Sequence, residues 1–378
     1  MAKSNFDLLK GRIPSLDGLR AISIGMVCVS HLLNVKGLAI RHSSSLGPLG
    51  VRIFFVISGM LITRLLVEEH ERRGTISLRA FYIRRTIRIF PAMWFYVAVM
   101  ATLGAAGVIV LQRHDILYAL TYTVNYFPQR SWYIGHIWSL SVEEQFYLLW
   151  PLALCLATPR RAVRIALLAI IIPLALRLLI LLLNPAADYH YWFPTACDAL
   201  AAGCLLSLLP EGSWKERAVR VASSRWFIAV PALVLLLNSL RYRAEGQIFL
   251  SMKSRLLFML FDTVGALAMN LGIALTLLHV VMNPRDLAGR VLNAGPMVWL
   301  GRISYSLYLW QMPFLNRDAE SWITRTPTNL IAALAAACFS YYLVENPLLE
   351  LRKRMKWGEP RDSRDREGKG AAVTEAAG

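Results

Sequence analysis

The sequence is dominated by long apolar runs separated by short polar links. The ranges 165–183, 256–282 and 330–343 carry almost no charged side chains. A helix rises 1.5 Å per residue, so about 20 apolar residues cross the hydrocarbon core of a bilayer, which is about 30 Å thick. The chain is 56% hydrophobic and only 17% charged, well outside the ordinary composition of water-soluble domains. We therefore predict an all-α protein that crosses a membrane several times.

Ten ranges have the length and composition of transmembrane helices. They are 19–36, 49–67, 89–111, 138–157, 165–183, 193–210, 226–240, 256–282, 298–316 and 327–346. The apolar range 115–127 is too short to span, and we predict a half-helix there at the outer face. Basic residues gather in alternate links, which by the positive-inside rule places both termini in the cytoplasm. The expected location is the cell inner (cytoplasmic) membrane, with the lipid bilayer as a partner.

A formal net charge of +17 is a property that many nucleic-acid-binding proteins share. The lysines and arginines lie in the links between apolar runs, however, and no nucleic-acid motif accompanies them. We attribute the charge to membrane topology and predict no nucleic-acid partner.

The chain divides into a transmembrane domain over 1–356 and a charged cytoplasmic tail over 357–378. The tail has no hydrophobic periodicity and is predicted to be disordered. The first twelve residues are too polar for a signal peptide, so we expect the first helix to be retained. The five cysteines lack the spacing of metal ligands, and we predict no metal site.

Two polar residues in the first predicted helix, Arg20 and His31, lie eleven positions apart. At 100° per residue they share one face and are separated by roughly 16 Å along the axis. A neutral imidazole can take a proton from a hydroxyl as a general base. The alternative is a histidine that only hydrogen-bonds between packed helices.

Two arginines, Arg85 and Arg88, share a face at the predicted cytoplasmic end of the third helix. Paired guanidinium groups suit phosphate, because they are planar and donate several hydrogen bonds. The alternative is that they anchor the helix end on the cytoplasmic side.

The predicted helix 138–157 begins with a polar stripe. Ser139, Glu143 and Tyr147 follow an i, i+4, i+8 spacing and therefore share a face, whereas Glu144 points about 100° away. Carboxylates inside a membrane need a partner or water, and one of the two could orient His31. The alternative is an internal salt bridge to an arginine such as Arg52. We assign Glu143 to a cavity and favour a structural pairing of Glu144 with an arginine.

Asp198 lies at the outer end of the predicted helix 193–210. Its carboxylate could bind acceptor hydroxyls or pair with a cation, and the sequence leaves both possibilities open.

An ordered series of motifs extends over most of the chain. It comprises Leu16-Asp17-Gly18-Leu19-Arg20 with His31, the Gly-Val-x-x-Phe-Phe-x-x-Ser-Gly stretch at 50–59, Arg85 with Arg88, the Trp-Ser-Leu-Ser-Val-Glu-Glu-Gln-Phe-Tyr block at 138–147, 300–310, and Val344-Glu345-Asn346-Pro347. Together these motifs resemble the acyltransferase-3 family of polytopic membrane enzymes over residues 12–355. The chain departs from the family pattern at Arg52, where an acid is frequent, at Gln311, where His is frequent, and at Cys197, where Arg is frequent.

The resemblance implies an O-acyltransferase that moves an acyl group, most often acetyl, from acyl-CoA to a sugar hydroxyl of an envelope polysaccharide or lipid-linked glycan. Acyl-CoA would dock from the cytoplasm on Arg85 and Arg88. The predicted catalytic group is His31, Glu143 and Arg20. The predicted substrate-binding residues are Ser139, Glu144, Tyr147 and Asp198. The alternative function is a proton-coupled transporter or flippase of a glycan intermediate, in which His31 and the glutamates relay protons.

Overall fold

The computed structural model describes residues 13–32, 43–208, 213–224, 227, 229–248, 250–316, 319 and 321–355. The described residues form helices joined by short links, and they contain no β-strand. The predicted disordered tail, 357–378, lies outside the described residues, as do the first twelve positions.

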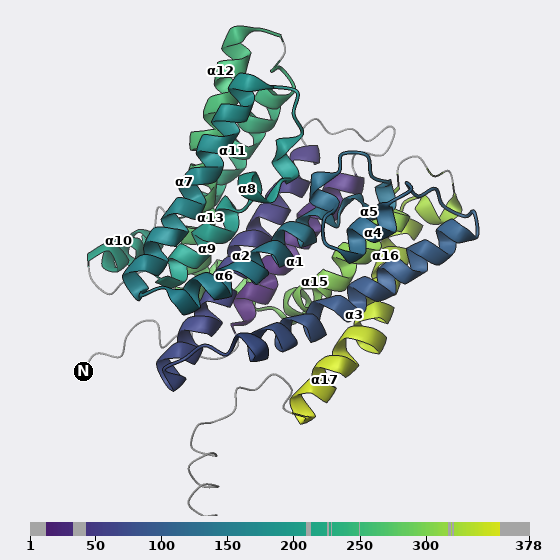
Figure 1. Ribbon diagram of the computed structural model, residues 1–378, viewed down its shortest axis with the longest axis horizontal. Coiled ribbons are helices and arrows are strands. Elements are labelled where there is room, and N and C mark those ends of the chain that lie inside the picture. Colours follow the sequence, from purple (N-terminus) through teal and green to yellow (C-terminus); the bar gives the residue numbers. More distant parts are fainter. Residues whose placement is uncertain are drawn as a thin grey trace, which may run out of the picture.

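The helices of the first half are α1 (Pro14–Leu32), α2 (Leu46–Arg73), α3 (Leu78–Ala105), α4 (Asp115–Leu120), α5 (Trp132–Gly135), α6 (Trp138–Leu156), α7 (Pro159–Leu183), α8 (Phe193–Ala196) and α9 (Asp198–Leu208). The second half continues with α10 (Ser213–Ala222), α11 (Ala229–Glu245), α12 (Met252–Leu260), α13 (Ala266–Met282), α14 (Leu287–Leu292), α15 (Gly295–Phe314), α16 (Thr328–Ser340) and α17 (Asn346–Arg354). Figure 1 shows α7, α11 and α12 as the upper part of the molecule, with α3 and α17 at its lower edge.

Each of the ten predicted ranges overlaps a helix, and the all-helical class is confirmed. Within the described residues, five helical stretches are long and apolar enough to cross a membrane: Leu46–Arg73, Leu78–Ala105, Arg160–Leu183, Met252–Met282 and Thr328–Arg354. Two of these contain a π-helical turn, at Phe261–Gly265 and at Tyr341–Glu345, which joins two α-helical parts into one span.

The predicted half-helix over 115–127 is short, as expected. Its chain forms α4 and a further single turn at Val124–Tyr126. The predicted start of the third helix at residue 89 is wrong, because α3 begins at Leu78. The Ser77 side chain accepts a hydrogen bond from the backbone N–H of Ala80 at 3.3 Å and caps the helix there. Arg85 and Arg88 consequently lie two to three turns inside α3 and not at its end.

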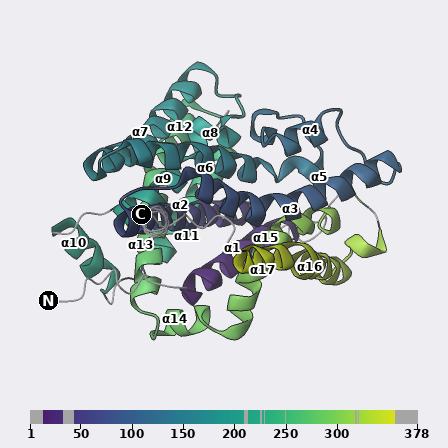
Figure 2. The ribbon, with the colours of Figure 1, turned by 60° about the horizontal axis from the view of Figure 1, so that its bottom comes forward.

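Four helices that carry the polar groups pack in a row without side chains between their backbones. A Cβ atom at Gly59 of α2 would clash with the carbonyl oxygen of Leu200 on α9, and one at Gly301 of α15 would clash with that of Asp17 on α1. A Cβ at Gly50 would lie 2.5 Å from the carbonyl oxygen of Ser23, which brings α1 against α2 in the same way. Figure 2 shows the resulting order α9, α2, α1 and α15 across the middle of the molecule.

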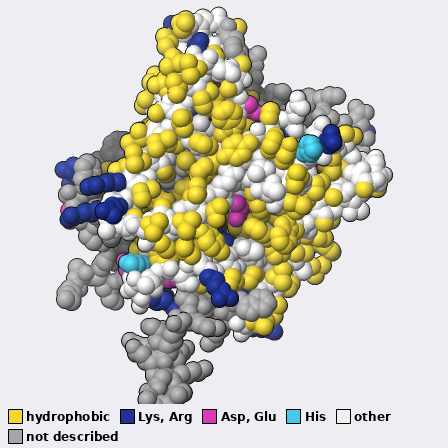
Figure 3. Space-filling view, in the orientation of Figure 1, with side chains coloured by type: hydrophobic (Ala, Val, Ile, Leu, Met, Phe, Trp, Pro, Cys, Tyr) yellow, Lys and Arg dark blue, Asp and Glu magenta, His cyan; other side chains and the backbone are white. Residues whose placement is uncertain are grey.

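The outer surface is mostly apolar, as a bilayer requires. On α7, large aliphatic side chains such as Leu168, Ile171 and Leu179 are at least half exposed. The face in Figure 3 is covered largely by hydrophobic side chains, with most lysines and arginines near its margins. The polar residues of interest are therefore enclosed between helices, away from this surface.

Candidate active site

A cavity of 110 Å³ lies between α1, α2, α3, α6, α15 and the turn that follows α16. Its described lining contains six ionisable side chains other than tyrosine: Arg20, Arg85, Arg88, Arg302, Glu143 and Glu345. Four positive charges against two negative ones leave an excess of positive charge. We refer to this space as the arginine cavity.

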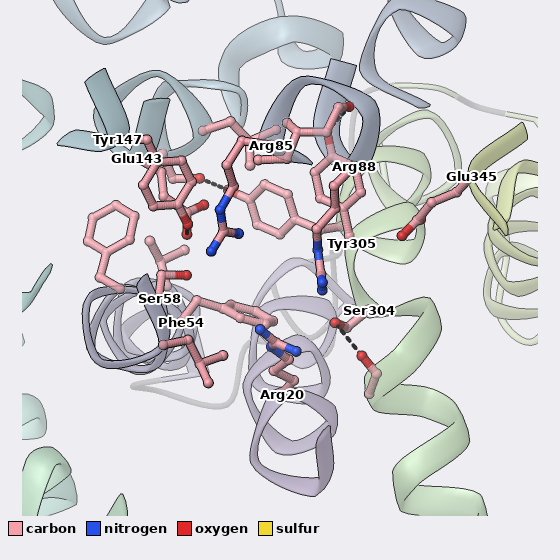
Figure 4. A pocket seen from close by; sticks show the side chains of 18 of the residues that line it. Arg20, Phe54, Ser58, Arg85, Arg88, Glu143, Tyr147, Ser304, Tyr305 and Glu345 are labelled. Carbon is pink, nitrogen blue, oxygen red and sulfur yellow. Dashed lines mark hydrogen bonds between the residues drawn. The ribbon is translucent and has the colours of Figure 1, made fainter. Parts of the chain in front are cut away.

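Three guanidinium groups from two helices converge on the arginine cavity. Figure 4 shows Arg85 and Arg88 of α3 and Arg20 of α1 pointing toward the same central space. The Arg85 guanidinium carbon lies 4.9 Å from the ring centre of Tyr147, and neither Arg85 nor Arg88 forms an ion pair with any residue that the structure describes. Arg20 lies 3.5 Å from the Asp17 carboxylate. The arrangement suits a polyanion such as a phosphate ester.

The polar stripe predicted on α6 lines the arginine cavity along its whole length. Ser139, Glu143 and Tyr147 all face it. The Tyr147 hydroxyl donates a hydrogen bond of 2.5 Å to the Glu143 carboxylate, and Ser139 Oγ lies 2.6 Å from the Tyr308 hydroxyl. This stripe thus places a carboxylate and hydroxyls on the wall opposite the arginines.

Glu144 forms no ion pair within 4 Å with an arginine that the structure describes, although Arg85 of the neighbouring helix α3 lies near enough to act on its charge. The Glu144 Oε1 atom is buried without a hydrogen-bond partner, and Arg52, the arginine considered for it, contacts Asp198 and Asn270 instead. Glu144 lies 100° around α6 from Glu143, which turns its side chain out of the arginine cavity.

The positions of Glu143 and Glu144 lead to different predictions for replacing each of them with glutamine. Glu143→Gln should lower turnover with little loss of folded protein, because Gln keeps the shape and loses the charge facing the arginines. Glu144→Gln should change the stability of the folded protein little, since Glu144 forms no described ion pair and its buried Oε1 has no hydrogen-bond partner. Turnover assays and thermal unfolding in detergent measure both effects. A dead but folded Glu144→Gln protein beside an active Glu143→Gln protein would reverse the assignment.

His31 lies in a different polar cluster, at the far end of α1 from Arg20. Its Nδ1 lies 2.8 Å from Oε1 of Gln311 on α15, and its ring packs edge-on against Trp132 at 5.5 Å. Because an amide oxygen only accepts hydrogen bonds, His31 carries its proton on Nδ1 and presents the basic lone pair on Nε2. The described hydrogen-bond partner of His31 is thus Gln311, where the sequence predicted Glu143 or Glu144.

Helix α15 contributes residues both to the arginine cavity and to the His31 cluster. Tyr305 and Tyr308 line the cavity, and Gln311 lies one turn beyond Tyr308. The Tyr308 hydroxyl donates a hydrogen bond of 2.9 Å to the backbone carbonyl of His136. His136 is 5% exposed, and neither nitrogen of its imidazole has a hydrogen-bond partner within the described residues.

Asp198 belongs to neither of these clusters. Its carboxylate accepts hydrogen bonds from Arg177 at 2.7 Å and from Asn270 at 2.8 Å, and it lies 3.4 Å from Arg52. The cation-paired alternative for Asp198 is thus the one found.

Sequence reasoning missed several residues that the structure brings to these sites. Glu345 and Tyr305 lie in motifs that had been recognised, but helical spacing alone does not show that they face Arg88 and Arg20. Arg177 and Asp262 are ionisable residues inside apolar runs, which is itself a signal of an internal polar site. Among the described residues, no group of three His, Cys, Asp or Glu side chains is arranged to hold a metal ion.

A family model described as an acyltransferase domain, acyltransferase-3, matches residues 13–345. The chain belongs to the acyltransferase-3 family. The match includes every residue assigned above to the arginine cavity and to the His31 cluster.

Several curated proteins of Staphylococcus aureus are similar to the chain. The O-acetyltransferase OatA of strain NCTC 8325 / PS 47 is 29% identical over 367 residues, which cover 89% of this chain and 57% of OatA. A second protein, of strain COL, is named as a candidate O-acetyltransferase and is 31% identical over 332 residues, covering 80% of this chain and 51% of that protein. The chain thus spans about half the length of these relatives. No solved structure matches significantly.

Proposed function

We propose that the protein is a membrane O-acyltransferase that moves an acetyl group from acetyl-CoA to a sugar hydroxyl of an envelope polysaccharide or lipid-linked glycan. Family membership and the O-acetyltransferase names of its relatives support the reaction class. The observation that carries the proposal is the convergence of Arg20, Arg85 and Arg88 on one internal cavity. Helix α15 contributes Tyr305 and Tyr308 to that cavity and, one turn further on, Gln311 to His31.

In the proposed topology, ten helices span the inner membrane and both termini are cytoplasmic. The basic links that guided this topology place the N-terminal ends of α1 and α3 on the cytoplasmic side. Arg20 and Arg85 then lie about two turns inside the membrane from that side. Acyl-CoA enters from the cytoplasm, and its phosphates bind Arg85 and Arg88, which have no described ion-pair partners to release.

The thioester arm extends along the α15 face toward His31. Arg20 and His31 are separated by roughly 16 Å along α1, a distance that an extended pantetheine arm covers. The Nε2 atom of His31 takes the proton of the acceptor hydroxyl. The oxygen attacks the thioester carbonyl, the C–S bond breaks, and the imidazolium returns the proton to the departing CoA thiolate. Gln311 holds the imidazole in the tautomer that this step needs.

The deciding experiment measures free CoA thiol released by the purified full chain in detergent or nanodiscs from acetyl-CoA, with and without sugar acceptors. The proposal predicts release that increases with acceptor concentration and an ester on the acceptor by mass spectrometry. A transporter or flippase of a glycan intermediate would release no CoA and would instead move the glycan across a vesicle membrane. That result would overturn the proposal.

A further inference from the structure

A second cavity, of 240 Å³, lies between α2, α7, α11 and the π-helical turn after α12. It is more than twice the volume of the arginine cavity, and a single water molecule needs only about 10–15 Å³. The two cavities share Val51 and Phe55 in their walls, and the neighbouring residues Trp138 and Ser139 line one cavity each. The second cavity therefore adjoins the arginine cavity at Val51 and Phe55.

The charges around the second cavity balance. Arg52, Arg177 and Arg241 line it together with Asp262 and Glu245, and Asp198 lies behind Arg52 and Arg177. Arg241 contacts Asp262 at 2.8 Å and Glu245 at 3.2 Å, while Arg177 contacts Asp198 at 2.7 Å. Counted with Asp198, the three arginines are thus each paired with a carboxylate, and the charges cancel. On the same count, with Asp17 beside Arg20, the arginine cavity keeps four arginines against three carboxylates, and its Arg85 and Arg88 form no described ion pair.

His190 does not alter this balance. Burial and the nearby Arg241 lower the pKa of His190 to about 3, so its imidazole is neutral near pH 7. Its Nδ1 lies 3.3 Å from Arg241 Nη2 and accepts that hydrogen bond.

The contrast with the arginine cavity indicates a different kind of ligand. An excess of arginine suits the phosphates of CoA, whereas a balanced set of guanidinium donors and carboxylate acceptors suits hydroxyl groups, which both donate and accept. Part of this set is accessible, since the side chains of Glu245 and His190 are 39% and 26% exposed. A neutral ligand with several hydroxyls would find partners of both kinds.

Aromatic rings provide the apolar part of the second cavity. Trp138, Tyr191 and Tyr242 line it, and the Trp138 and Tyr191 rings meet at 4.8 Å in an edge-to-face arrangement. The C–H groups of a sugar ring pack well on such faces, and a largely aromatic lining with a few placed polar groups is typical of small-molecule sites.

We propose that the second cavity binds the acceptor as a neutral, hydroxyl-rich ring, such as one sugar residue of a glycan, and that Phe55 separates this ring from the acyl-CoA in the arginine cavity until transfer. Binding of the ring follows from the second cavity itself, while its role as acceptor rests on the proposed acyltransferase function. Phe55 is 4% exposed, and its ring packs edge-on against the Trp138 ring at a centre-to-centre distance of 6.2 Å. Phe55 therefore contacts one of the aromatic rings on which we expect the sugar to pack.

The binding arm of the test uses saturation-transfer NMR with N-acetylglucosamine and the full chain in nanodiscs. We expect saturation transfer to the sugar protons in the wild type and its loss in Tyr242→Ala. Trp322→Ala, which removes an aromatic ring that is 71% exposed and outside this cavity, should keep the signal. Coenzyme A should not displace the sugar. Absence of the wild-type signal, its retention in Tyr242→Ala, or its displacement by coenzyme A would each overturn the inference.

The partition arm measures CoA release from acetyl-CoA without any acceptor. Phe55→Ala joins the two cavities and should raise this uncoupled release several-fold, because water from the second cavity then reaches the bound acyl-CoA. Phe146→Ala is the matched control, since Phe146 is also 4% exposed but lines neither cavity. Equal release from the two variants would show that Phe55 is not the partition.

The two arms separate this inference from the proposed function. If the protein were no acyltransferase, acceptor-dependent CoA release would be missing while sugar binding and its loss in Tyr242→Ala remained. If the acceptor bound elsewhere, acceptor-dependent release would persist and the KM for the sugar would be the same in Tyr242→Ala and the wild type.

Discussion

Replacing His31 with alanine is expected to lower acyl transfer by about 10²–10⁴-fold, the usual contribution of a general base. The loss should appear in kcat, because the imidazole acts on the acceptor's proton and does not hold the CoA phosphates, which lie at the other end of α1. His31 is only partly buried, and it contacts Gln311 and Trp132. Thiol release and mass spectrometry of the acetylated product measure the effect.

His114→Ala is the control for this experiment. His114 is exposed before α4 and lies far along the chain from both clusters, so its loss should leave turnover unchanged. Near wild-type turnover in a folded His31→Ala protein would exclude His31 as the base. The buried His136, whose ring nitrogens have no described partner, would then be the next residue to test.

Removing either Arg85 or Arg88 is expected to weaken acetyl-CoA binding by roughly ten- to a hundredfold. A hydrogen bond to a charged group contributes about 1.5–3 kcal/mol, and about 1.4 kcal/mol is a tenfold change in affinity. Lysine should restore only part of the affinity, because an ammonium group lacks the planar fork that binds phosphate at two points. Calorimetric titration with coenzyme A gives the affinity directly, and the loss should be larger at low ionic strength.

Arg79→Ala is the matched control. Arg79 is an exposed arginine in the first turn of α3 and contributes to the same basic link, but it does not line the arginine cavity. If all three variants bind coenzyme A with wild-type affinity, the arginines of α3 serve only to orient the helix in the membrane.

Much of the fold was predictable because membrane helices can be recognised from the length and composition of their apolar ranges. Each apolar range became a helix, and the i, i+4 stripe of α6 faces one cavity as its geometry requires. The start of α3 was misplaced because its first three turns are rich in basic residues, so apolar content alone placed the start of the predicted span at residue 89. The Ser77 cap was the local signal for the true start.

The site was less predictable, because its parts come from helices far apart in the sequence. Helical phase showed that Glu143 and Glu144 diverge, but not which arginine either one meets. Gln311 approaches His31 across 280 residues of sequence, and no local pattern encodes that contact. The charge pairs of the second cavity, such as Arg177 with Asp198, likewise depend on how α7 and α9 cross.

The close backbone packing of α9, α2, α1 and α15 limits how this protein can move. Where glycines bring carbonyl groups into direct contact, sliding or tilting one helix against the next would force atoms to overlap. Rocking of one half of a bundle against the other, on which alternating access depends, would have to begin by separating these helices. Rotation of a single aromatic side chain requires no such separation and is faster than any collective helix motion. We therefore expect distances between spin labels on α9 and α15 to stay constant through the catalytic cycle. The acyl donor and the acceptor would then each bind and leave from the cavity that holds it, without a rearrangement of the helices.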